Sequence, residues 1–521
     1  MAEISHENFC GLRLSDLLDL LLKDDLNDQE MEQRLDQARL EPAGPRPSIE
    51  TLLHAFLPHK YVLHTHAQAI LTLGALSDGH NLLAQAFGPE TAVLPLIMSG
   101  FPLAKAVYEA VRLKPDLKAV VIADHGIFTF DDQVEKAYER MISYAGMAED
   151  YLNEQLRRTH FFIATVKPEQ TLPRHEFACR VAQILRGLMV RNEIASNQLT
   201  VRRQAEVRCD AELLSASCSP HLELICCSGV VTPDHVIRTK NRYALLKVSS
   251  QADDREINAA AKRMLEEYSR DYAVHLNLSA TEAKSLGIEL TPSVVVISGG
   301  GLIGFAPNRR EALMAADIAA LTIKERLKAM ALGGFTPIAD ESMRATELWA
   351  PERSKLSAAC ARLNGCSTLI CGSRYELMER TAANYLEQGA DIIFIAPSSA
   401  ALDRLTRNLS VKYGRHRLCA MTEDKFNKGL CSGFDAVFIL CQRLEFKKLA
   451  TALEAFATVF RRQGIGGMVI ILHENASIPP DMDKLTVILN EFEALKVTVR
   501  FVDRQNLEVY LAGLAQQAPH C

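Results

Sequence analysis

The sequence predicts an α/β protein built from two copies of one α/β block, followed by a domain with an open parallel sheet. From about residue 48 to residue 157, short apolar runs alternate with amphipathic helical patterns, which is typical of α/β architecture. Residues 120–130 align without a gap on residues 295–305, which indicates an internal repeat. Further on, a helical pattern separates the apolar runs 367–372 and 389–396, and this β-α-β order predicts parallel strands.

Length and composition place the chain among soluble proteins of several domains. A chain of 521 residues exceeds one ordinary core, so two to four domains are expected. The apolar fraction of 48% and the charged fraction of 23% are those of globular proteins. A net charge of −6 without a basic tract argues against nucleic acid as a partner. The start of the chain lacks the pattern of a signal peptide, and no run is long enough for a membrane span. Thirteen cysteines without paired metal spacing fit a reducing compartment, so a cytoplasmic location is expected.

The elements of the first block follow from local patterns in chain order. Residues 12–40 predict amphipathic helices that end before the proline-rich turn 41–47. Residues 61–70 and 119–126 are strand-like apolar runs, and a helix is expected from residue 134. A helical stretch at about 174–192 then leads into the second block.

Three histidines and one carboxylate in the first block suggest a metal site. His64 and His66 lie one residue apart in a strand-like run, so alternation along the strand puts both imidazoles on the same face. His125 ends the second strand-like run, and Glu50 lies upstream of all three. Three neutral imidazoles with a nearby carboxyl group, and one position left open, are the composition of a catalytic zinc site.

Other interpretations of the same residues stay open on spacing alone. Two histidines in a strand are equally compatible with solvated or hydrogen-bonded side chains. His54 and His59 are alternative ligands, although a second-shell or surface position is the preferred interpretation for both. Glu50 can also be a carboxylate that stabilises the start of a helix, because negative charge is favourable there.

Two anchors define the internal repeat. Residues 120–130 align on 295–305 at an offset of 175 (295 minus 120), and residues 62–66 align on 236–240 at an offset of 174 (236 minus 62). In place of the three histidines, the second copy then has Arg238, Lys240 and Gly300. None of these side chains offers a lone pair to a metal, so the second copy is expected to keep the fold without the metal. Arg238 and Lys240 are interpreted either as a site for an anion or a carboxylate, or as ordinary surface charges.

The repeat also bears on a glycine-rich segment. Residues 299–304 follow a strand-like run and resemble a phosphate-binding glycine loop. A dinucleotide-binding fingerprint belongs in the opening β-α turn of its domain, with an acidic residue about 20 positions later. Alignment with the first copy accounts for the segment better, so no dinucleotide is expected there.

The β-α-β pattern of the third block resembles the opening of the short-chain dehydrogenase family. Later apolar runs at 435–440 and 467–472 predict further parallel strands of a Rossmann-like domain. The family needs Gly372 and two further glycines, where this chain has Glu376 and Met378. A glutamate would repel a pyrophosphate, and a methionine side chain would block close approach of the backbone. The family's asparagine-rich segment is replaced at Cys441, and its Tyr-x-x-x-Lys pair is missing, with Tyr510 the only tyrosine after residue 480. The resemblance therefore implies a degenerate domain, without NAD and without dehydrogenase activity.

The first block resembles the class II aldolase/adducin family. Pro-Ser-Ile-Glu ending at Glu50, His-Thr-His at 64–66, and the run 121–130 with a helix after it match that family in order and spacing. The resemblance implies that His64, His66 and His125 hold Zn²⁺ or another divalent metal ion and that Glu50 is the catalytic acid/base. It also implies that Ser48 contacts the substrate phosphate.

The order of the three blocks resembles the bifunctional rhamnulose-1-phosphate aldolase/alcohol dehydrogenase family. The expected domains are an aldolase-like domain at 1–160, a linking domain and degenerate repeat at 161–345, and a degenerate dehydrogenase domain at 346–521. Family members carry an N-terminal glycine-rich segment that this chain is expected to lack. They form rings with sites between subunits, so a homo-oligomer is expected.

This resemblance implies a metal-dependent lyase that cleaves a small ketose phosphate, similar to rhamnulose 1-phosphate. The products would be a dihydroxyacetone-phosphate-type compound and an aldehyde. Two alternatives stay open: a non-catalytic scaffold, as the adducin relatives are, and a metal-dependent epimerase or decarboxylase on the same site.

Overall fold

The computed structural model describes residues 8–160, 168–192, 200–349, 353, 363–429, 431–440, 446–473 and 482–503. The chain forms two compact units. Unit 1 comprises Met1–Phe162, Ser228–Ile237 and Leu321–Ser357, and unit 2 comprises Ile163–Cys227, Arg238–Ala320 and Ala358–Cys521. The predicted domain limits at residues 160 and 345 stay predictions. Positions Cys441 and Tyr510 lie outside the described residues. Within the described ranges, no helix has the length and apolar character that a membrane span requires.

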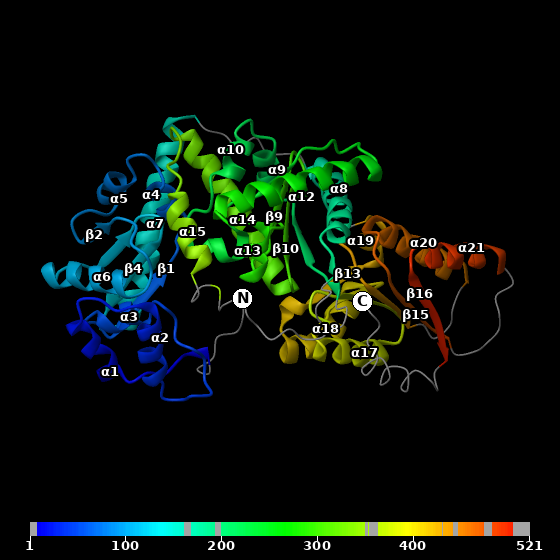
Figure 1. The fold of residues 1–521 in the computed structure, drawn as a ribbon, viewed down its shortest axis with the longest axis horizontal. Helices are drawn as coiled ribbons and strands as arrows, with labels where there is room; N and C mark the ends of the chain where they lie inside the picture. The colour runs from blue at the N-terminus through cyan, green and yellow to red at the C-terminus, as the bar shows by residue number, and fades with distance from the viewer. Residues whose placement is uncertain are drawn as a thin grey trace. The chain divides into compact units, whose positions relative to one another are not determined.

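Unit 1 contains a four-stranded sheet with helices on both faces (Figure 1). The strand order is β1-β4-β3-β2, in which β2 and β3 are parallel and the other pairs are antiparallel. The strands are β1 (Tyr61–Thr65), β2 (Thr91–Leu94), β3 (Ala119–Ile122) and β4 (Gly126–Asp131). One face is covered by α1 (Leu14–Leu18), η2 (Asp19–Leu22), α2 (Asp28–Gln37), α3 (Thr51–Phe56) and α6 (Phe101–Leu113). The other face is covered by α4 (Gln68–Gly74), α5 (Gly79–Phe87) and α7 (Val134–Arg158).

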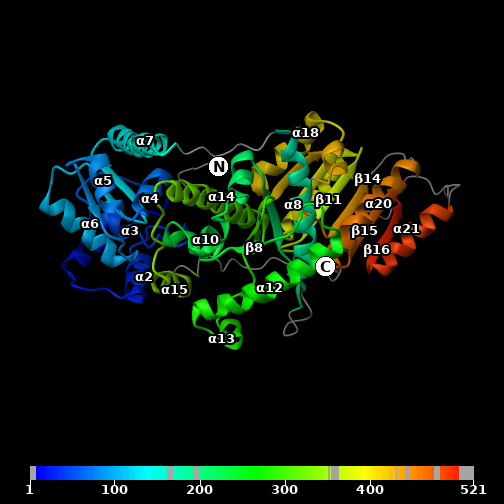
Figure 2. The ribbon, with the colours of Figure 1, turned by 90° about the horizontal axis from the view of Figure 1, so that it is seen from above.

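Strand β3 explains why this sheet needs helices on both faces. All four of its residues are buried, and they alternate between the two faces of the sheet. Val120 and Ile122 pack in the core beside α3 and α6, whereas Ala119 and Val121 pack in the core beside α4 and α7. Figure 2 shows α7 on the opposite side of this domain from α2 and α3. The continuous apolar run is therefore a strand buried on both faces.

Two later segments of the chain return to unit 1 and pack there. Val230 and Val236 share a small apolar core with Ile338 and Met343. The fully buried Arg326 donates a hydrogen bond from Nη2 to the carbonyl oxygen of Val230 at 2.8 Å. These segments contain η3 (Pro233–His235), the last part of α14 (Arg309–Ala331) and α15 (Asp340–Leu348). Unit 1 is therefore assembled from three separate stretches of sequence.

The first part of unit 2 repeats the sheet of unit 1, as the sequence predicted. Its strand order, β7-β10-β9-β8, has the same pattern of one parallel and two antiparallel pairs. The strands are β7 (Gln204–Arg208), β8 (Ala244–Leu246), β9 (Val294–Ile297) and β10 (Gly301–Ala306). The helices are α8 (Pro168–Leu188), α9 (Ala211–Ser217), α10 (Leu222–Cys227), α12 (Asp254–Leu276), α13 (Ala280–Ser285) and the first part of α14. Helix α11 (Val236–Thr239) crosses from unit 1 into unit 2, and β5 (Arg191–Asn192) pairs with β6 (Thr200–Val201). Residues 299–304 belong to the β9–β10 hairpin rather than to a β-α turn, so the hairpin, not a phosphate loop, accounts for the glycines.

Strand register corrects one anchor of the predicted repeat. His64 pairs with Phe128 in the first copy, and Val207 pairs with Ile303 in the second. Phe128 and Ile303 are separated by the repeat offset of 175 (303 minus 128), so Val207 is the counterpart of His64. Cys209, two positions further, is then the counterpart of the second histidine. The predicted alignment of residues 62–66 on 236–240 is wrong, because Val236–Thr239 is a helix.

The charged residues of that rejected alignment have structural partners in unit 2. Arg238 pairs with Glu311 at 3.1 Å. Lys240 donates hydrogen bonds to the carbonyl oxygens of Glu289 and Thr291 and is almost fully buried. They are therefore neither counterparts of the metal-site histidines nor ordinary surface charges. Gly300 does occupy the position of His125, and the Sγ of Cys209 lies 3.7 Å from its carbonyl oxygen.

The C-terminal part of unit 2 is a Rossmann-like parallel sheet of six strands. The order β13-β12-β11-β14-β15-β16 is that of a doubly wound fold. The strands are β11 (Ser367–Gly372), β12 (Asp391–Ala396), β13 (Leu418–Thr422), β14 (Ala436–Leu440), β15 (Gly467–His473) and β16 (Val497–Asp503). Figure 1 shows α17 (Tyr375–Glu387) and α18 (Ser399–Tyr413) on one face, and α20 (Phe446–Gln463) and α21 (Met482–Ala494) on the other. The short elements η4 (Arg415–Arg417) and α19 (Glu423–Asn427) flank β13. The two edge strands, β13 and β16, were not predicted.

Candidate metal site

Glu50 is fixed at the start of helix α3, where it is the N-cap residue. Its backbone N–H donates a hydrogen bond to the Ser48 hydroxyl oxygen at 3.2 Å. Leu52, Leu53 and Phe56 of α3 are buried in the core, so the helix has little freedom to move. The carboxylate therefore projects from a rigid element.

The first histidine, His64, is held by two contacts with strand β4. Its Nδ1 lies 3.0 Å from the carbonyl oxygen of Ile127, where it can only donate a hydrogen bond. Its ring stacks on that of Phe128, with ring centres 3.9 Å apart and planes 7° from parallel. With the proton on Nδ1, the lone pair of Nε2 is available to a metal ion.

His125 lies in the tight turn between β3 and β4, and His66 directly follows the end of β1. The turn needs an unusual backbone: Asp124 has a φ of +57°, and Gly126 has a φ of +156°. A Cβ atom on Gly126 would lie 2.5 Å from the carbonyl oxygen of Thr65 and 3.1 Å from the rings of both His64 and His66. A glycine is therefore required where the turn passes the neighbouring strand.

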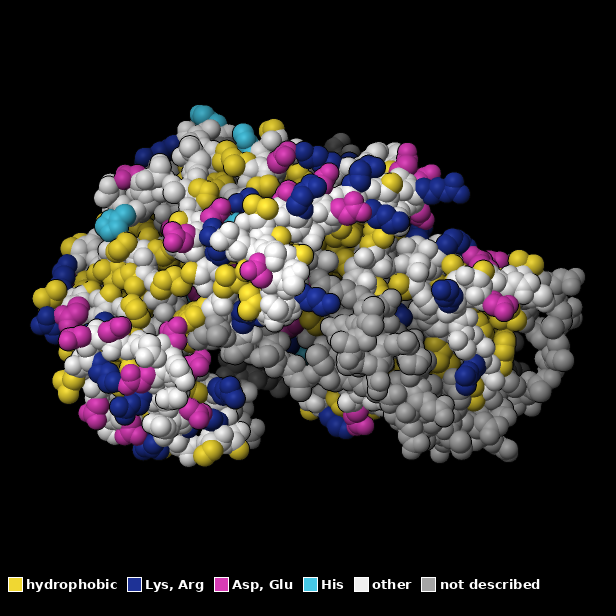
Figure 3. Space-filling model, in the orientation of Figure 1, with side chains coloured by type: hydrophobic (Ala, Val, Ile, Leu, Met, Phe, Trp, Pro, Cys, Tyr) yellow, Lys and Arg dark blue, Asp and Glu magenta, His cyan; other side chains and the backbone are white. Residues whose placement is uncertain are grey.

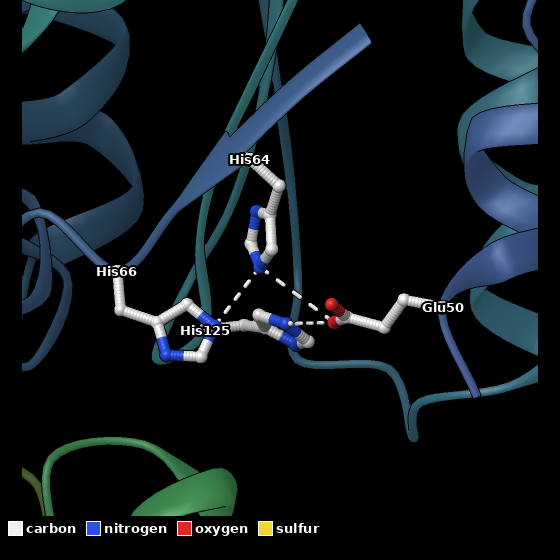
Figure 4. Close-up of side chains that lie close together, drawn as sticks. All are labelled: Glu50, His64, His66 and His125. Atoms are coloured by element: carbon white, nitrogen blue, oxygen red, sulfur yellow. Dashed lines mark hydrogen bonds and ion pairs between the residues drawn. The ribbon is translucent and has the colours of Figure 1, made fainter. Parts of the chain in front are cut away.

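The four predicted side chains converge on one point (Figure 4). Their ligand atoms all lie within 4.8 Å of one another. Nε2 of His64 lies 2.9 Å from Nε2 of His66 and 3.6 Å from Oε1 of Glu50, and Nε2 of His125 lies 3.0 Å from the same oxygen. Two atoms that each bind one ion at about 2.0–2.2 Å lie roughly 3–3.6 Å apart at tetrahedral or octahedral angles. The donor set thus fits a divalent ion in its chemistry, and the three distances given above lie in or next to this range.

Burial and charge set the protonation of these groups. Burial alone raises the pKa of Glu50, but the hydrogen bond with His125 and the nearby imidazoles outweigh it and lower the pKa to about 2. Burial lowers the pKa of His64 to about 4, despite the charge of Glu50. Burial also opposes protonation of His125, but its hydrogen bond to Glu50 and the charge of Asp234 raise its pKa. At neutral pH, Glu50 is therefore a carboxylate and His64 is a neutral donor.

The other residues considered in the sequence lie outside this cluster. His54 Nδ1 is 3.1 Å from the carbonyl oxygen of Val62, and His59 stacks on Phe130. Ser48 is exposed, and its contact with a substrate phosphate stays a prediction.

Sequence reasoning missed two residues that the structure brings to the cluster. Asp234 Oδ2 lies 3.5 Å from Nε2 of His66 and 3.7 Å from Nε2 of His125, and the ring of His235 lies 6.3 Å from that of His66. Nothing in the local pattern around Asp234 signalled this position.

A small hollow lies beside the cluster in unit 1. The space counted in this hollow is about 250 Å³, and part of that space is open to solvent. Asp234 lines it together with apolar and hydroxyl side chains: Ile97, Met98, Ser99, Pro233, Thr346 and Trp349. On the face of the molecule seen in Figure 3, acidic and basic side chains are intermixed.

Two family models match stretches of the first two blocks. Residues 19–152 match the family model described as "Class II Aldolase and Adducin N-terminal domain". Residues 176–356 match the model described as "Aldolase class II, second domain". The first match contains Glu50 and all three histidines of the cluster, and the second contains Asp234.

Comparison with single proteins gives one curated relative and one solved structure. The "Uncharacterized oxidoreductase YuxG" of Bacillus subtilis (strain 168) is 26% identical over 429 residues, which are 81% of this chain and 61% of the relative. This chain thus spans about three-fifths of the length of that protein. A structure of the N-terminal class II aldolase domain of a conserved protein from Thermoplasma acidophilum is 37% identical, covering 29% of this chain and 68% of that one, with a TM-score of 0.27. The family matches and the oxidoreductase-named relative together support an aldolase-plus-dehydrogenase-like architecture.

Proposed function

We propose, on the premise that residues 19–152 form a class II aldolase domain, that this protein is a divalent-metal-dependent lyase of the aldolase type. The observation that carries the proposal is the convergence of three imidazole nitrogens and the Glu50 carboxylate on one point. His64, His66 and His125 would hold Zn²⁺ or a similar ion. When bound, the ion supplies a Lewis acid that stabilises the negative charge developing as a carbon–carbon bond beside a carbonyl group breaks.

Glu50 is the proton-transfer group of the proposed reaction. In retro-aldol cleavage a hydroxyl group loses its proton, the carbon–carbon bond breaks, and the carbon on the carbonyl side keeps the electron pair and takes up a proton. A carboxylate at this position would start as the base, take up the hydroxyl proton and return it to the carbon on the carbonyl side. In this structure its Oε1 pairs with Nε2 of His125. If His125 held a metal ion through that nitrogen, the lone pair would be used for the ion, and the Glu50 carboxylate would be free of this hydrogen bond.

The proposed substrate is a small ketose phosphate similar to rhamnulose 1-phosphate, cleaved into a dihydroxyacetone-phosphate-type product and an aldehyde. Ser48, two residues before Glu50, is the proposed contact for the substrate phosphate.

Hydride transfer is not proposed for the C-terminal domain. The backbone N–H groups of Ser373 and Arg374, after β11, donate to the carbonyl oxygen of Leu440 at 3.1 and 3.3 Å. In a dinucleotide-binding fold the N–H groups of this turn face the pyrophosphate. A Cβ atom on Gly372 would lie 2.1 Å from the same carbonyl oxygen, so this glycine serves close contact between β11 and β14.

The test is the metal content of the purified protein, followed by cleavage assays on a panel of ketose phosphates. We expect about one divalent ion per chain, lost in His64→Ala and in His125→Ala but retained in His80→Ala, an exposed histidine outside the cluster. Glu50→Gln should retain metal and lose roughly 10²–10⁴-fold in turnover, the usual contribution of a general acid/base.

Three outcomes would contradict the proposal in different ways. A folded protein that binds no divalent metal would leave a non-catalytic scaffold as the better account. Metal binding with an isomerised or decarboxylated product would assign the site to an epimerase or a decarboxylase. Full turnover by Glu50→Gln would remove Glu50 from the reaction.

A further inference from the structure

We propose that Asp234 is a fifth residue of the metal site and a direct ligand of the ion, supplied by the returning segment 228–237. This inference rests on the proposed metal site and adds to it a residue from outside the N-terminal domain. Asp234 approaches His66 and His125, whereas Glu50 approaches His64 and His125. The two carboxylates therefore contact different pairs of histidines.

The atoms that Asp234 faces distinguish a ligand from a supporting residue. A carboxylate that only orients a metal-bound histidine contacts the ring nitrogen turned away from the ion. The carbonyl oxygen of Ile127 has that position, because it contacts Nδ1 of His64. Asp234 Oδ2 instead faces Nε2 of both His66 and His125, the nitrogens that converge on the proposed ion. Its distances of 3.5 and 3.7 Å are close to the roughly 3–3.6 Å expected between two ligands of one ion.

The hydrogen bonding of Asp234 points the same way. Its Oδ2 atom is buried and accepts no hydrogen bond from the protein. A buried carboxylate oxygen without a donor costs free energy, unless a cation or a proton compensates it. A divalent ion held by the three histidines would provide that compensation.

The segment that carries Asp234 is held firmly enough to position a ligand. Asp234 lies in the 3-10 turn η3, which begins at Pro233, a residue with a fixed φ. Val230 and Val236, on either side of the turn, are buried in the small core that the segment shares with the chain around α15. The hydrogen bond from Arg326 to Val230 fixes the backbone before the turn. Asp234 is thus held in unit 1 by packing that does not depend on the histidines.

A ligand at this position has a consequence for the role of Glu50. With three imidazoles and Asp234 as ligands, the protein would supply four donors without Glu50, and an ion that expands to five-coordinate would keep a position for the substrate. Glu50 then remains free to carry a proton, as a general acid/base must. The inference therefore assigns the two carboxylates of the site to different tasks.

The experiment compares zinc affinity of the full-length wild type, Asp234→Ala and Asp234→Asn by competition with a chromogenic chelator. Asp116→Ala, which changes an exposed aspartate of unit 1, is the matched control. We expect both Asp234 variants to bind zinc more weakly by at least the roughly 10–100-fold that loss of an outer-shell partner causes. The thermal unfolding of the metal-free variants, compared with that of the metal-free wild type, shows whether the fold is intact.

Cobalt substitution provides a readout that a purely structural role would not change. The visible absorption of Co²⁺ depends on the number and kind of its ligands. We expect the spectrum of Co²⁺-loaded Asp234→Asn to differ from that of the wild type, and the spectrum of Asp116→Ala to match it.

The outcomes separate this inference from the proposed function. If the wild type binds zinc and both Asp234 variants bind it equally well with an unchanged cobalt spectrum, Asp234 is not a ligand and the lyase proposal stands. If the wild type itself binds no divalent ion, the proposed metal site fails and this inference fails with it.

Discussion

Replacing Gly126 by alanine should weaken metal binding without removing a ligand. The added Cβ atom would lie 2.5 Å from the carbonyl oxygen of Thr65 and 3.1 Å from atoms of the His64 and His66 rings. The closest ordinary contact of such an atom is about 3.4 Å, so the strand and both rings must shift by several tenths of an ångström. Overpacking of this kind typically costs about 1–3 kcal/mol.

The same free energy sets the expected loss of affinity. If the two rings move to relieve the clash, they leave the positions in which their Nε2 atoms converge. A cost of about 1–3 kcal/mol then corresponds to roughly 5- to 150-fold weaker zinc binding, because 1.4 kcal/mol is a factor of ten. Gly126 also has a φ of +156°, which adds backbone strain to the substitution.

Gly88→Ala is the control that separates backbone strain from the clash. Gly88 also has a positive φ, +72°, but its added Cβ atom would meet no atom within 4 Å. Zinc affinity is measured by competition with a chromogenic chelator, and stability by thermal unfolding of the metal-free protein. We expect Gly88→Ala to lose stability and keep its zinc affinity. A folded Gly126→Ala protein that binds zinc as tightly as Gly88→Ala would refute the reasoning.

Three further predictions concern the packing around the site and the C-terminal sheet. Asp435→Asn should cost about 3–5 kcal/mol in unfolding free energy, because it breaks a buried pair with two arginines, and denaturant unfolding checks this. Burial raises the pKa of Asp435 but the arginines lower it overall, so this stability is present above about pH 4 and is lost as the pH falls further. Unfolding followed against pH should show a smaller loss below about pH 4 in Asp435→Asn than in the wild type. Glu325→Ala should lower the melting temperature, since it removes the ion pair of this buried carboxylate with Lys328 at 2.9 Å and leaves the Thr72 hydroxyl only the carbonyl oxygen of Gln68 as an acceptor. Gly372→Ala should destabilise the sheet between β11 and β14 and leave zinc content unchanged; a loss of zinc would contradict the separation of the two parts.

The buried cluster around Asp435 shows how unit 2 joins its two parts. Asp435 accepts hydrogen bonds from Arg186 of α8 at 2.8 Å, from Arg202 at 2.5 Å and from the backbone N–H of Ser367 at 2.7 Å. The arginines come from the degenerate aldolase-like copy, whereas Asp435 and Ser367 belong to the Rossmann-like sheet. The second copy has no histidine at the positions of the first copy's cluster, and its buried arginines connect it to the C-terminal sheet.

The sequence predicted those features that depend on short-range geometry. The period of two along a strand puts His64 and His66 on one face, and the alternation of strands and helices predicts the layers. The central strands of both sheets in the repeat, and four of the six C-terminal strands, follow from apolar runs, because a strand buried on both faces needs an unbroken apolar sequence. The edge strand β13 was missed because its apolar run is short, with only five residues. The edge strand β16 was missed because charged residues such as Arg500 interrupt its apolar run.

The tertiary structure alone decided which distant residues meet. The register of β7 against β10 shows that Val207, rather than Arg238, replaces His64, and no local pattern specifies which strand pairs with β10. Asp234 joins the histidines because the chain leaves unit 2 and returns to unit 1, where Val230 and Val236 find an apolar core. Sequence spacing determines which side chains share a face of one element. The free energy of packing over the whole chain determines which elements lie together, and that sum is not contained in any single segment.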